Sequence, residues 1–358
     1  MSAAPALRFP RTFTIAGRPI GAGHPCLLIA EAGVNHNGSA ELAHRLIDAA
    51  AEAGADAVKF QTFRTDGLLT SDAPKAAYQV ANTGTGGSQQ SMLRALELQP
   101  DVFAGLSEHC ARRGLLFLST PFDHESVDLL SALGMPAFKV PSGEVTHPAL
   151  LEHVAAQGRP VLLSTGMATL AEVDEAVRCL SGAGCRELAL LQCTSTYPAP
   201  PEEANLRVIG TYAQAFGVPV GFSDHTLGEA VAPAAVALGA VMVEKHFTLD
   251  TALPGPDHRA SLDPSGFRRL VAAVRAVEAA LGDGIKRPTA GEMDTRAVAR
   301  RSLFVRHALP AGHRLTAVDL VALRPAGGIA PNHRDLILGR RTTRPLTGGE
   351  RLDWSDLA

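Results

Sequence analysis

Eight short apolar runs, each followed by an alanine-rich amphipathic segment, constrain the fold more than any other feature of the sequence. The runs are almost continuously hydrophobic, which is typical of parallel strands that helices cover on both faces. They occupy residues 27–31, 57–61, 115–120, 137–142, 161–165, 188–194, 218–223 and 241–246. Eight strand–helix units predict a closed (β/α)8 barrel of the TIM type. An open doubly wound sheet also alternates in this way, but the phosphate fingerprint G-x-G-x-x-G does not follow the first run.

Three segments lie outside these eight units. A hairpin is expected at Phe13–Ile20, with its turn at Ala16-Gly17-Arg18. Residues 64–100 form an insertion after the second run, either a solvated loop or, as we favour, a lid over the barrel mouth. The barrel domain should span residues 1–282, followed by a linker at residues 283–296 that is rich in Gly, Pro and charge.

The last part of the chain, residues 297–358, has a different pattern of short segments broken by Gly and Pro. The motif L-x-x-G-x-x-L-x-x-x-D-L at residues 309–320 recurs 37 residues later, at residues 346–357. Two copies are too few for a solenoid. They predict a small β-rich domain with pseudo-two-fold symmetry.

Composition excludes several classes of partner. The net charge of -3 and the 19% of charged residues give no broad basic field, so we expect neither nucleic acid nor an anionic membrane as a partner. No apolar stretch reaches the length of a membrane span, and the first residues lack the apolar core of a signal peptide. The five cysteines contain no C-x-x-C and suit reduced thiols, so we expect a cytoplasmic protein.

Polar residues stand at the C-terminal end of each of the eight apolar runs. In TIM barrels the catalytic residues occupy this end of the strands. Burying charges costs several kcal/mol each unless they are paired or used, so such a ring predicts an active site. Its members are Glu31, Lys59, Gln61, Thr120, Lys139, Ser142, Glu144, Ser164, Thr165, Thr194, Ser195, Tyr197, Ser223, Asp224, His225, Glu244, Lys245 and His246.

Two histidines of this ring are candidate metal ligands. His225 and His246 are separated by about one strand-plus-helix unit, a spacing that brings two imidazoles to one rim. Two imidazoles suit a first-row divalent ion, yet they are too few to close a structural zinc site. Each could instead be a hydrogen-bonded core or loop residue. The nearby Asp224, Glu244 and Asp257 favour a ligand set.

A series of motifs in one order, covering nearly the whole chain, resembles the sialic acid synthase family. The motifs are IAEAGVNHNGS, VKFQTF, STPFD, KVPSGE, STGMAT, CTSTYPAP, GFSDHT, EKHFTLD and GPDH. The tail, RSLFV followed by LRPAGGIAP, resembles the C-terminal antifreeze-like domain of that family, also called the SAF domain.

The resemblance implies condensation of phosphoenolpyruvate with an N-acetylmannosamine-type hexose. The products are a nine-carbon 2-keto sugar acid, of the kind used in nonulosonic acid and polysaccharide biosynthesis, and phosphate. It also implies a divalent ion, manganese or magnesium, and a domain-swapped homodimer in which one subunit's antifreeze-like domain closes the other's barrel. The alternative is a legionaminate or pseudaminate synthase acting on a 2,4-diacetamido-2,4,6-trideoxyhexose. Ser195 does not decide which of these sugars is the substrate. The segment GPDHRASLDP, by contrast, resembles the sialic and legionaminic branches of the family more than the pseudaminic branch.

By match to the family, the candidate site residues fall into three groups. The catalytic group is Glu31 with the two metal ligands, His225 and His246. The expected phosphoenolpyruvate-binding residues are Lys59, Thr120, Lys139, Ser142, Ser195 and Ser223. The expected sugar-binding residues are Gln61, Glu144, Tyr197, Asp257 and, from the partner subunit, Arg324.

Two rival functions stay open at this point. A Schiff-base aldolase on the same barrel would use Lys59, Lys139 or Lys245 as its nucleophile. A non-catalytic ice- or carbohydrate-binding protein is suggested by the tail alone. That second rival leaves the ring of polar residues unexplained, and the sequence lacks the regularly spaced threonines that such a surface needs.

Overall fold

The eight apolar runs form the eight strands of one parallel sheet in the computed structural model, which describes residues 9–358. Their order in the sheet is β5-β4-β3-β10-β9-β8-β7-β6, and β5 and β6 at its two ends contact each other. The sheet is thus a nearly closed barrel, and the predicted TIM-type fold is confirmed. The strands are β3 (Leu27–Gly33), β4 (Ala57–Thr62), β5 (Leu116–Pro121), β6 (Phe138–Val140), β7 (Val161–Ser164), β8 (Leu188–Cys193), β9 (Val220–Asp224) and β10 (Met242–His246).

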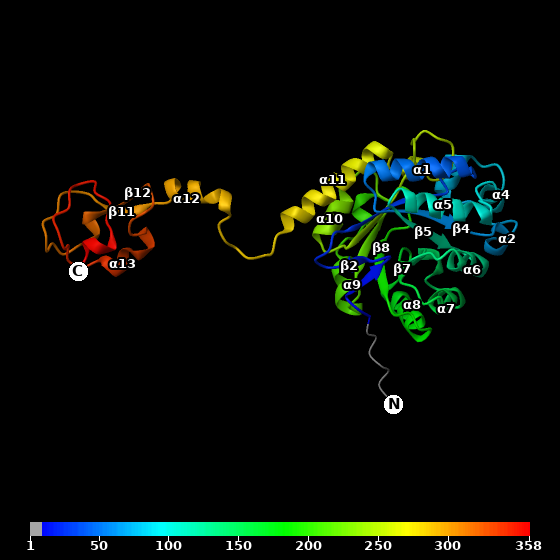
Figure 1. Cartoon of the computed structure of the whole chain (residues 1–358), viewed down its shortest axis with the longest axis horizontal. Helices are drawn as coiled ribbons and strands as arrows, with labels where there is room; N and C mark the ends of the chain where they lie inside the picture. Colours follow the sequence, from blue (N-terminus) through cyan, green and yellow to red (C-terminus); the bar gives the residue numbers. More distant parts are fainter. Residues whose placement is uncertain (1–8) are drawn as a thin grey trace, which may run out of the picture. The chain divides into compact units, whose positions relative to one another are not determined.

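Eight helices alternate with these strands and cover the outside of the barrel (Figure 1). Local sequence signals mark their ends: Thr169 and Glu172 form a capping box at the start of α8, and Gly54 closes α1 in the left-handed conformation. The helices are α1 (Ala40–Ala53), α5 (Pro100–Arg112), α6 (His124–Ala132), α7 (Pro148–Ala156), α8 (Leu170–Gly182), α9 (Val208–Phe216), α10 (Val231–Ala237) and α11 (Pro264–Leu281). No helix of the described residues is long and apolar enough to cross a membrane.

The N-terminal hairpin closes the bottom of the barrel. Strands β1 (Thr12–Ile15) and β2 (Arg18–Gly21) are joined by Ala16 and Gly17, which both have positive φ. Such a two-residue turn matches the twist of a hairpin. The predicted three-residue turn is therefore one residue too long, because Arg18 already belongs to β2. Phe13, Ile15 and Ile20 are buried and pack against the lowest inward-facing side chains of the barrel.

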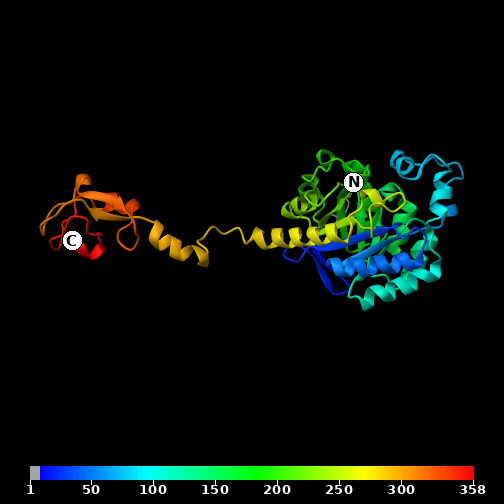
Figure 2. The same cartoon turned by 90° about the horizontal axis from the view of Figure 1, so that it is seen from above.

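The insertion after β4 folds into three short helices, α2 (Thr65–Leu68), α3 (Ala77–Thr83) and α4 (Gln89–Arg94). These helices stand at one end of the barrel, where Figure 2 shows them in cyan. Residues of all three line the cavity at the mouth of the barrel. The insertion is thus not a solvated loop, and we call residues 64–100 the lid.

The contacts divide the chain after Gly282, and residues 283–358 form a second compact unit. Its elements are α12 (Met293–Ala299), β11 (Ser302–Val305), β12 (Leu320–Leu323) and α13 (Arg334–Ile337). Helix α12 begins inside the segment expected to be a linker, after a capping box between Thr289 and Glu292.

The internal repeat of the second unit appears directly in its backbone pairing. Leu309 and Leu346, which are equivalent in the two copies, exchange hydrogen bonds of 2.8 and 2.9 Å across an antiparallel bridge. The amide of Arg306 donates to the carbonyl of Asp319, and 37 residues later that of Thr343 donates to Asp356. The two copies are therefore related by the pseudo-two-fold symmetry that the repeat predicts.

Candidate active site

The interior of the barrel changes from apolar to polar within a single step along each strand. Residues i and i+2 of a strand point to the same side, so each pair below lies one above the other inside the barrel. The pairs are Ile29 and Glu31, Ala57 and Lys59, Leu118 and Thr120, Ala137 and Lys139, Leu162 and Ser164, Leu191 and Cys193, Gly221 and Ser223, and Met242 and Glu244. We call the first members the lower layer and the second members the upper layer.

The upper layer forms the floor of a cavity of about 450 Å³ at the mouth of the barrel. This volume suits small-molecule ligands. Thirteen of the fourteen predicted site residues line the cavity. The remaining one, Arg324, is exposed in the second unit. The thirteen are Glu31, Lys59, Gln61, Thr120, Lys139, Ser142, Glu144, Ser195, Tyr197, Ser223, His225, His246 and Asp257.

Two lysines and two glutamates form a buried charge network on this floor. Lys59 Nζ lies 2.7 Å from Glu31 Oε2 and donates a hydrogen bond of 2.8 Å to Thr120 Oγ1. Glu244 lies between the lysines, with Oε2 at 3.8 Å from Lys59 Nζ and Oε1 at 3.2 Å from Lys139 Nζ. Buried charges need partners, and these four side chains compensate one another.

Within the network, the pKa values of the two glutamates shift in opposite directions, and so do those of the two lysines. Burial and the charge of Glu244 raise the pKa of Glu31. Burial also opposes ionisation of Glu244, yet Lys139 and Lys59 outweigh it and lower the pKa of Glu244 to about 2. Burial lowers the pKa of Lys139, whereas at Lys59 the two carboxylates overcome burial and raise it. Divergent pKa values among neighbouring groups are typical of acid–base sites.

The two predicted metal ligands lie side by side on the wall of the cavity. The rings of His225 and His246 have centroids 5.3 Å apart, and the ring of Tyr197 lies against that of His225 at 4.1 Å, tilted by 36°. His225 Nδ1 donates to the carbonyl of Thr194 at 2.7 Å, which leaves Nε2 for another partner. The buried Nδ1 of His246 has no hydrogen-bond partner and lies 3.9 Å from a carboxylate oxygen of Asp257.

The charge states of the two imidazoles differ. Burial and the neighbouring cations lower the pKa of His246 well below its usual value, which keeps this ring neutral. Burial acts in the same direction on His225, but Cys193 and the Thr194 carbonyl outweigh it and raise the pKa. Residues 9–358 contain no group of three or more His, Cys, Asp or Glu side chains placed to hold a metal.

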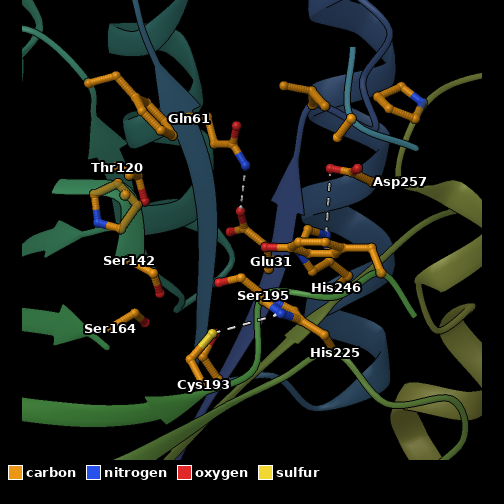
Figure 3. Close-up of a pocket in the computed structure, with 18 of the residues that line it drawn as sticks. Glu31, Gln61, Thr120, Ser142, Ser164, Cys193, Ser195, His225, His246 and Asp257 are labelled. Atoms are coloured by element: carbon orange, nitrogen blue, oxygen red, sulfur yellow. Dashed lines mark hydrogen bonds and ion pairs between the residues drawn. The ribbon is translucent and has the colours of Figure 1, made fainter. Parts of the chain in front are cut away.

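Hydroxyl groups face the histidines across the cavity. In the view of Figure 3, Thr120, Ser142 and Ser164 lie on one side, and His225 and His246 lie on the other. Ser142 Oγ accepts a hydrogen bond of 2.8 Å from the amide of Gly166. A Cβ atom on Gly166 would lie too close to the hydroxyls of Ser142 and Ser195, so a larger residue here would displace both hydroxyls from the cavity wall.

The remaining predicted residues surround the upper part of the cavity. Gln61 Nε2 donates to Glu31 Oε1 at 3.1 Å, and Glu144 Oε2 lies 2.6 Å from Nδ1 of His147. Burial, reinforced by the charge of Glu31, raises the pKa of Asp257 to about 7. This carboxyl group therefore changes its charge near neutral pH.

The roles assigned from the sequence missed several residues of the cavity. Ser164 and Glu244 belonged to the polar ring, but neither was assigned to a substrate, and the structure places both on the floor. The hydroxyl of Ser164 is buried without a hydrogen-bond partner, and that of Ser223 donates to Glu244 at 2.9 Å. The period-2 pattern does not separate them from outward-facing neighbours, because Val243 and Lys245 show the same step from apolar to polar as Met242 and Glu244.

One candidate nucleophile lies outside the cavity. Lys245 is buried on the other face of β10, where Nζ pairs with Asp224 at 2.8 Å and also bonds the carbonyl of Thr226. It does not line the cavity. Successive residues of a strand point to opposite faces, so Lys245 points away from the cavity that Glu244 faces. The prediction that Lys245 could serve as a Schiff-base nucleophile is therefore wrong.

Comparison with known proteins decides the family. The model of the NeuB family matches residues 46–286, and that of the SAF domain matches residues 300–358. The chain belongs to the NeuB family. It is 45% identical to N,N'-diacetyllegionaminic acid synthase of Legionella pneumophila over 95% of this chain and 97% of that protein. The synthase of the same name from Campylobacter jejuni is 44% identical, with coverages of 89% and 96%.

A solved structure agrees with this assignment. The spore coat polysaccharide biosynthesis protein SpsE of Bacillus subtilis matches with a TM-score of 0.66 and 36% identity, over 97% of this chain and 99% of that one. The resemblance seen in the sequence motifs is thus confirmed. The chain is an enzyme of the NeuB family, which condenses phosphoenolpyruvate with a hexosamine-type sugar.

Proposed function

We propose that the cavity is the site of this condensation, in a cytoplasmic enzyme that uses a divalent metal. The observation that carries the proposal is the buried network of Lys59, Glu31, Glu244 and Lys139 beneath two adjacent imidazoles. Two lysines suit a ligand with a carboxylate and a phosphate, since compact ammonium groups bind both. Phosphoenolpyruvate would thus lie across the floor.

The hydroxyl side of the cavity completes the proposed phosphoenolpyruvate site. The hydroxyl groups there donate hydrogen bonds to anionic oxygens. The two lysines supply charge, and Ser164 adds a hydroxyl that has no partner of its own. The hydroxyl residues proposed for this ligand are Thr120, Ser142, Ser164, Ser195 and Ser223.

The sugar would bind above, between Gln61, Glu144, Tyr197 and Asp257. We assign His225 and His246 to a manganese or magnesium ion, since the Nδ1 of His246 lacks a partner and Nε2 of His225 is available. When bound, this ion supplies a Lewis acid for the aldehyde oxygen of the open-chain sugar. Because the pKa of His225 is raised, metal affinity should increase with pH as its proton is lost.

In the proposed reaction, the electrons of the C2–C3 double bond of phosphoenolpyruvate form the new bond from carbon 3 to the aldehyde carbon. Positive charge is left at carbon 2, and the aldehyde oxygen takes a proton from solvent. Water then adds to carbon 2, and the tetrahedral product loses phosphate to give the 2-keto acid. Glu31 is our candidate for the group that accepts the proton of this water, because its raised pKa suits a general base. Lys59, 2.7 Å from Glu31, would hold the substrate anion next to it.

The phosphate-release assay tests the reaction and the metal together. We expect phosphate to be released from phosphoenolpyruvate in the presence of N-acetylmannosamine or a 2,4-diacetamido-2,4,6-trideoxyhexose. Chelation should abolish turnover, and manganese or magnesium should restore it. A stable borohydride adduct on Lys59 or Lys139 in the presence of a keto acid would instead support the Schiff-base aldolase. Glycan binding without phosphate release from any acylated hexosamine would support a non-catalytic protein.

We further propose a domain-swapped homodimer in which Arg324 of one subunit contacts the sugar's acylamino group in the other. Support comes from the match of residues 300–358 to the SAF domain and from the exposure of Arg324. Arg324→Ala should raise the KM for the sugar. Mixing it with His225→Ala should partly restore activity through heterodimers. No recovery in verified heterodimers would show that Arg324 acts in its own subunit or not at all.

A further inference from the structure

The loop between β10 and α11 brings Asp257 to the cavity, although it has little regular structure. Within the described chain, the only element of this loop is a turn of 3-10 helix, His258–Ala260. Asp257 is buried, lines the cavity and has a carboxylate oxygen 3.9 Å from Nδ1 of His246 (Figure 3). Backbone groups outside regular elements need other partners. The position of Asp257 therefore depends on side chains that hold the loop in place.

Asn37, in the turn between β3 and α1, contacts this loop on both sides of Asp257. Its Nδ2 donates a hydrogen bond of 2.9 Å to the carbonyl of Pro254, three residues before Asp257. Its Oδ1 lies 3.2 Å from Nε2 of His258, the residue that follows Asp257. His258 is fully buried, and its Nδ1 lies 2.7 Å from the hydroxyl of Thr248 at the start of the loop. One side chain thus fixes the segment that carries Asp257 from two directions.

The backbone on each side of this contact suits it. Asn37 has a left-handed backbone with φ of 51°, a conformation that asparagine adopts more readily than most residues. Gly255 lies opposite, with φ of 150°. A Cβ atom on Gly255 would lie 2.7 Å from Cδ2 of His258 and 2.9 Å from Oδ1 of Asn37. The missing side chain at this position therefore lets Asn37 reach His258.

Asn35, in the same turn, holds the two ends of the loop. Its side chain is buried, and its Nδ2 donates hydrogen bonds of 2.9 Å to the carbonyl of Phe247 and to the hydroxyl of Ser261. The hydroxyl of Ser261 donates in turn to the carbonyl of Asp257 at 2.7 Å. Phe247 directly follows the proposed metal ligand His246. The turn after β3 therefore anchors the loop from its first residue to the residues beyond Asp257.

We propose that Asn37 is a positioning residue that acts through Asp257, holding the carboxyl group of Asp257 toward His246 and the sugar. Asn37 does not line the cavity, so it is not itself a binding residue. The residues proposed for phosphoenolpyruvate all lie outside residues 247–262, so a shift of this loop should change sugar binding selectively. This inference rests on the proposed function, in which Asp257 contacts the sugar.

Asn37→Gly tests the proposal because glycine keeps the left-handed backbone and removes both side-chain contacts. The assay is phosphate release with N-acetylmannosamine or a 2,4-diacetamido-2,4,6-trideoxyhexose, whichever the wild type uses. The variant should raise the KM for the sugar on the order of 10-fold, since two hydrogen bonds to the loop are lost. Its KM for phosphoenolpyruvate should stay within about twofold of the wild type, because independent sites respond separately.

Asn205→Gly is the matched control. Asn205 also has a left-handed backbone, with φ of 43°, but it is exposed and lies outside the cavity. The control should change neither KM. Asn37→Asp is the milder variant, because it keeps an oxygen toward His258 and loses the donor to Pro254. Its KM for the sugar should lie between those of the wild type and Asn37→Gly.

A double variant shows whether Asn37 acts through Asp257. Added to Asp257→Asn, Asn37→Gly should raise the KM for the sugar by less than about twofold more, because residues that act through one contact are not additive. The same fold-change with and without Asp257→Asn would mean an independent role and would overturn the proposal. Gly255→Ala disturbs the same contact from the side of the loop and should raise the KM for the sugar in the same selective way.

Thermal unfolding checks that each variant is folded at the assay temperature. An unchanged KM for the sugar in folded Asn37→Gly would overturn the positioning role and leave the proposed reaction intact. An equal rise in KM for both substrates would also overturn it, because it would show a general structural effect. Release of phosphate by the wild type with neither sugar would overturn the proposed function itself, and the positioning role with it.

Discussion

The lower and upper layers of the barrel come from the same strands and point to the same interior, yet the lower layer is apolar and the upper layer is charged. Neighbouring positions on one face of a strand are only about 7 Å apart. The lower layer, with Ile29, Leu118 and Leu162, is buried apolar surface packed against the hairpin. The upper layer holds two lysines and two glutamates that are just as buried. The lower layer thus stabilises the fold, whereas the upper layer carries the groups proposed for the reaction.

The difference has an energetic consequence. Burial of apolar side chains stabilises the fold, whereas buried charges lose hydration that their mutual attraction only partly replaces. Active sites commonly reduce stability in this way, because the groups are arranged for the reaction and not for the fold. Substitutions in the two layers should therefore separate activity from stability.

The largest effect is expected for Glu31→Gln in the upper layer. If Glu31 accepts the proton of the attacking water, kcat should fall by about 10²- to 10⁴-fold. Stability should be unchanged or increased, because a pKa raised by burial means that the carboxylate is disfavoured in the folded state. Phosphate-release kinetics and thermal unfolding measure the two quantities. Ile29→Val, one step lower on β3, is the matched control and should leave kcat unchanged. A variant that kept wild-type kcat would remove Glu31 from the mechanism.

The opposite result is expected one layer down, for Leu162→Ala on β7. This side chain is fully buried, so its truncation should lower the free energy of unfolding by about 2–5 kcal/mol. The kcat/KM of the protein that remains folded should stay close to the wild-type value. Ser164→Ala, two residues further along β7, should instead raise the KM for phosphoenolpyruvate and change the free energy of unfolding little. Denaturant unfolding gives the first quantity, and equal destabilisation by the two variants would contradict the division into layers.

The sequence predicted the strands well because a parallel barrel needs long apolar runs, and these survive as a pattern. It did not predict which face each polar residue occupies. Glu244 and Lys245 are adjacent in the run that ends at His246, yet one lies in the charge network and the other pairs with Asp224 behind the sheet. A shift of one residue reverses the face, and only the register of the folded strand decides it.

The lid was harder to predict for a different reason. Its helices are four to seven residues long, too short to show an amphipathic period. Their positions depend on contacts that are distant in sequence, such as the bond from Asn82 to Pro256. Gln79, a buried lid residue that lines the cavity, therefore gives no signal in the sequence.

The smallest expected effect concerns Asp257, at the border between the charged floor and the lid. Its pKa rises from 3.8 in the unfolded chain to about 7 in the folded protein because of burial. Between these values the folded state holds a proton that the unfolded state has released. Rising pH therefore lowers the stability of the wild type, and the loss is complete above pH 7. Asp257→Asn lacks this proton, so its melting temperature relative to the wild type should increase from pH 5 to pH 8. A difference on the order of 1 kcal/mol corresponds to about 2–4 °C. Thermal unfolding in the presence of a chelator keeps bound metal out of the comparison. Parallel curves for the two proteins would mean that Asp257 does not titrate between pH 5 and pH 8, which would contradict the raised pKa at the edge of the charged floor.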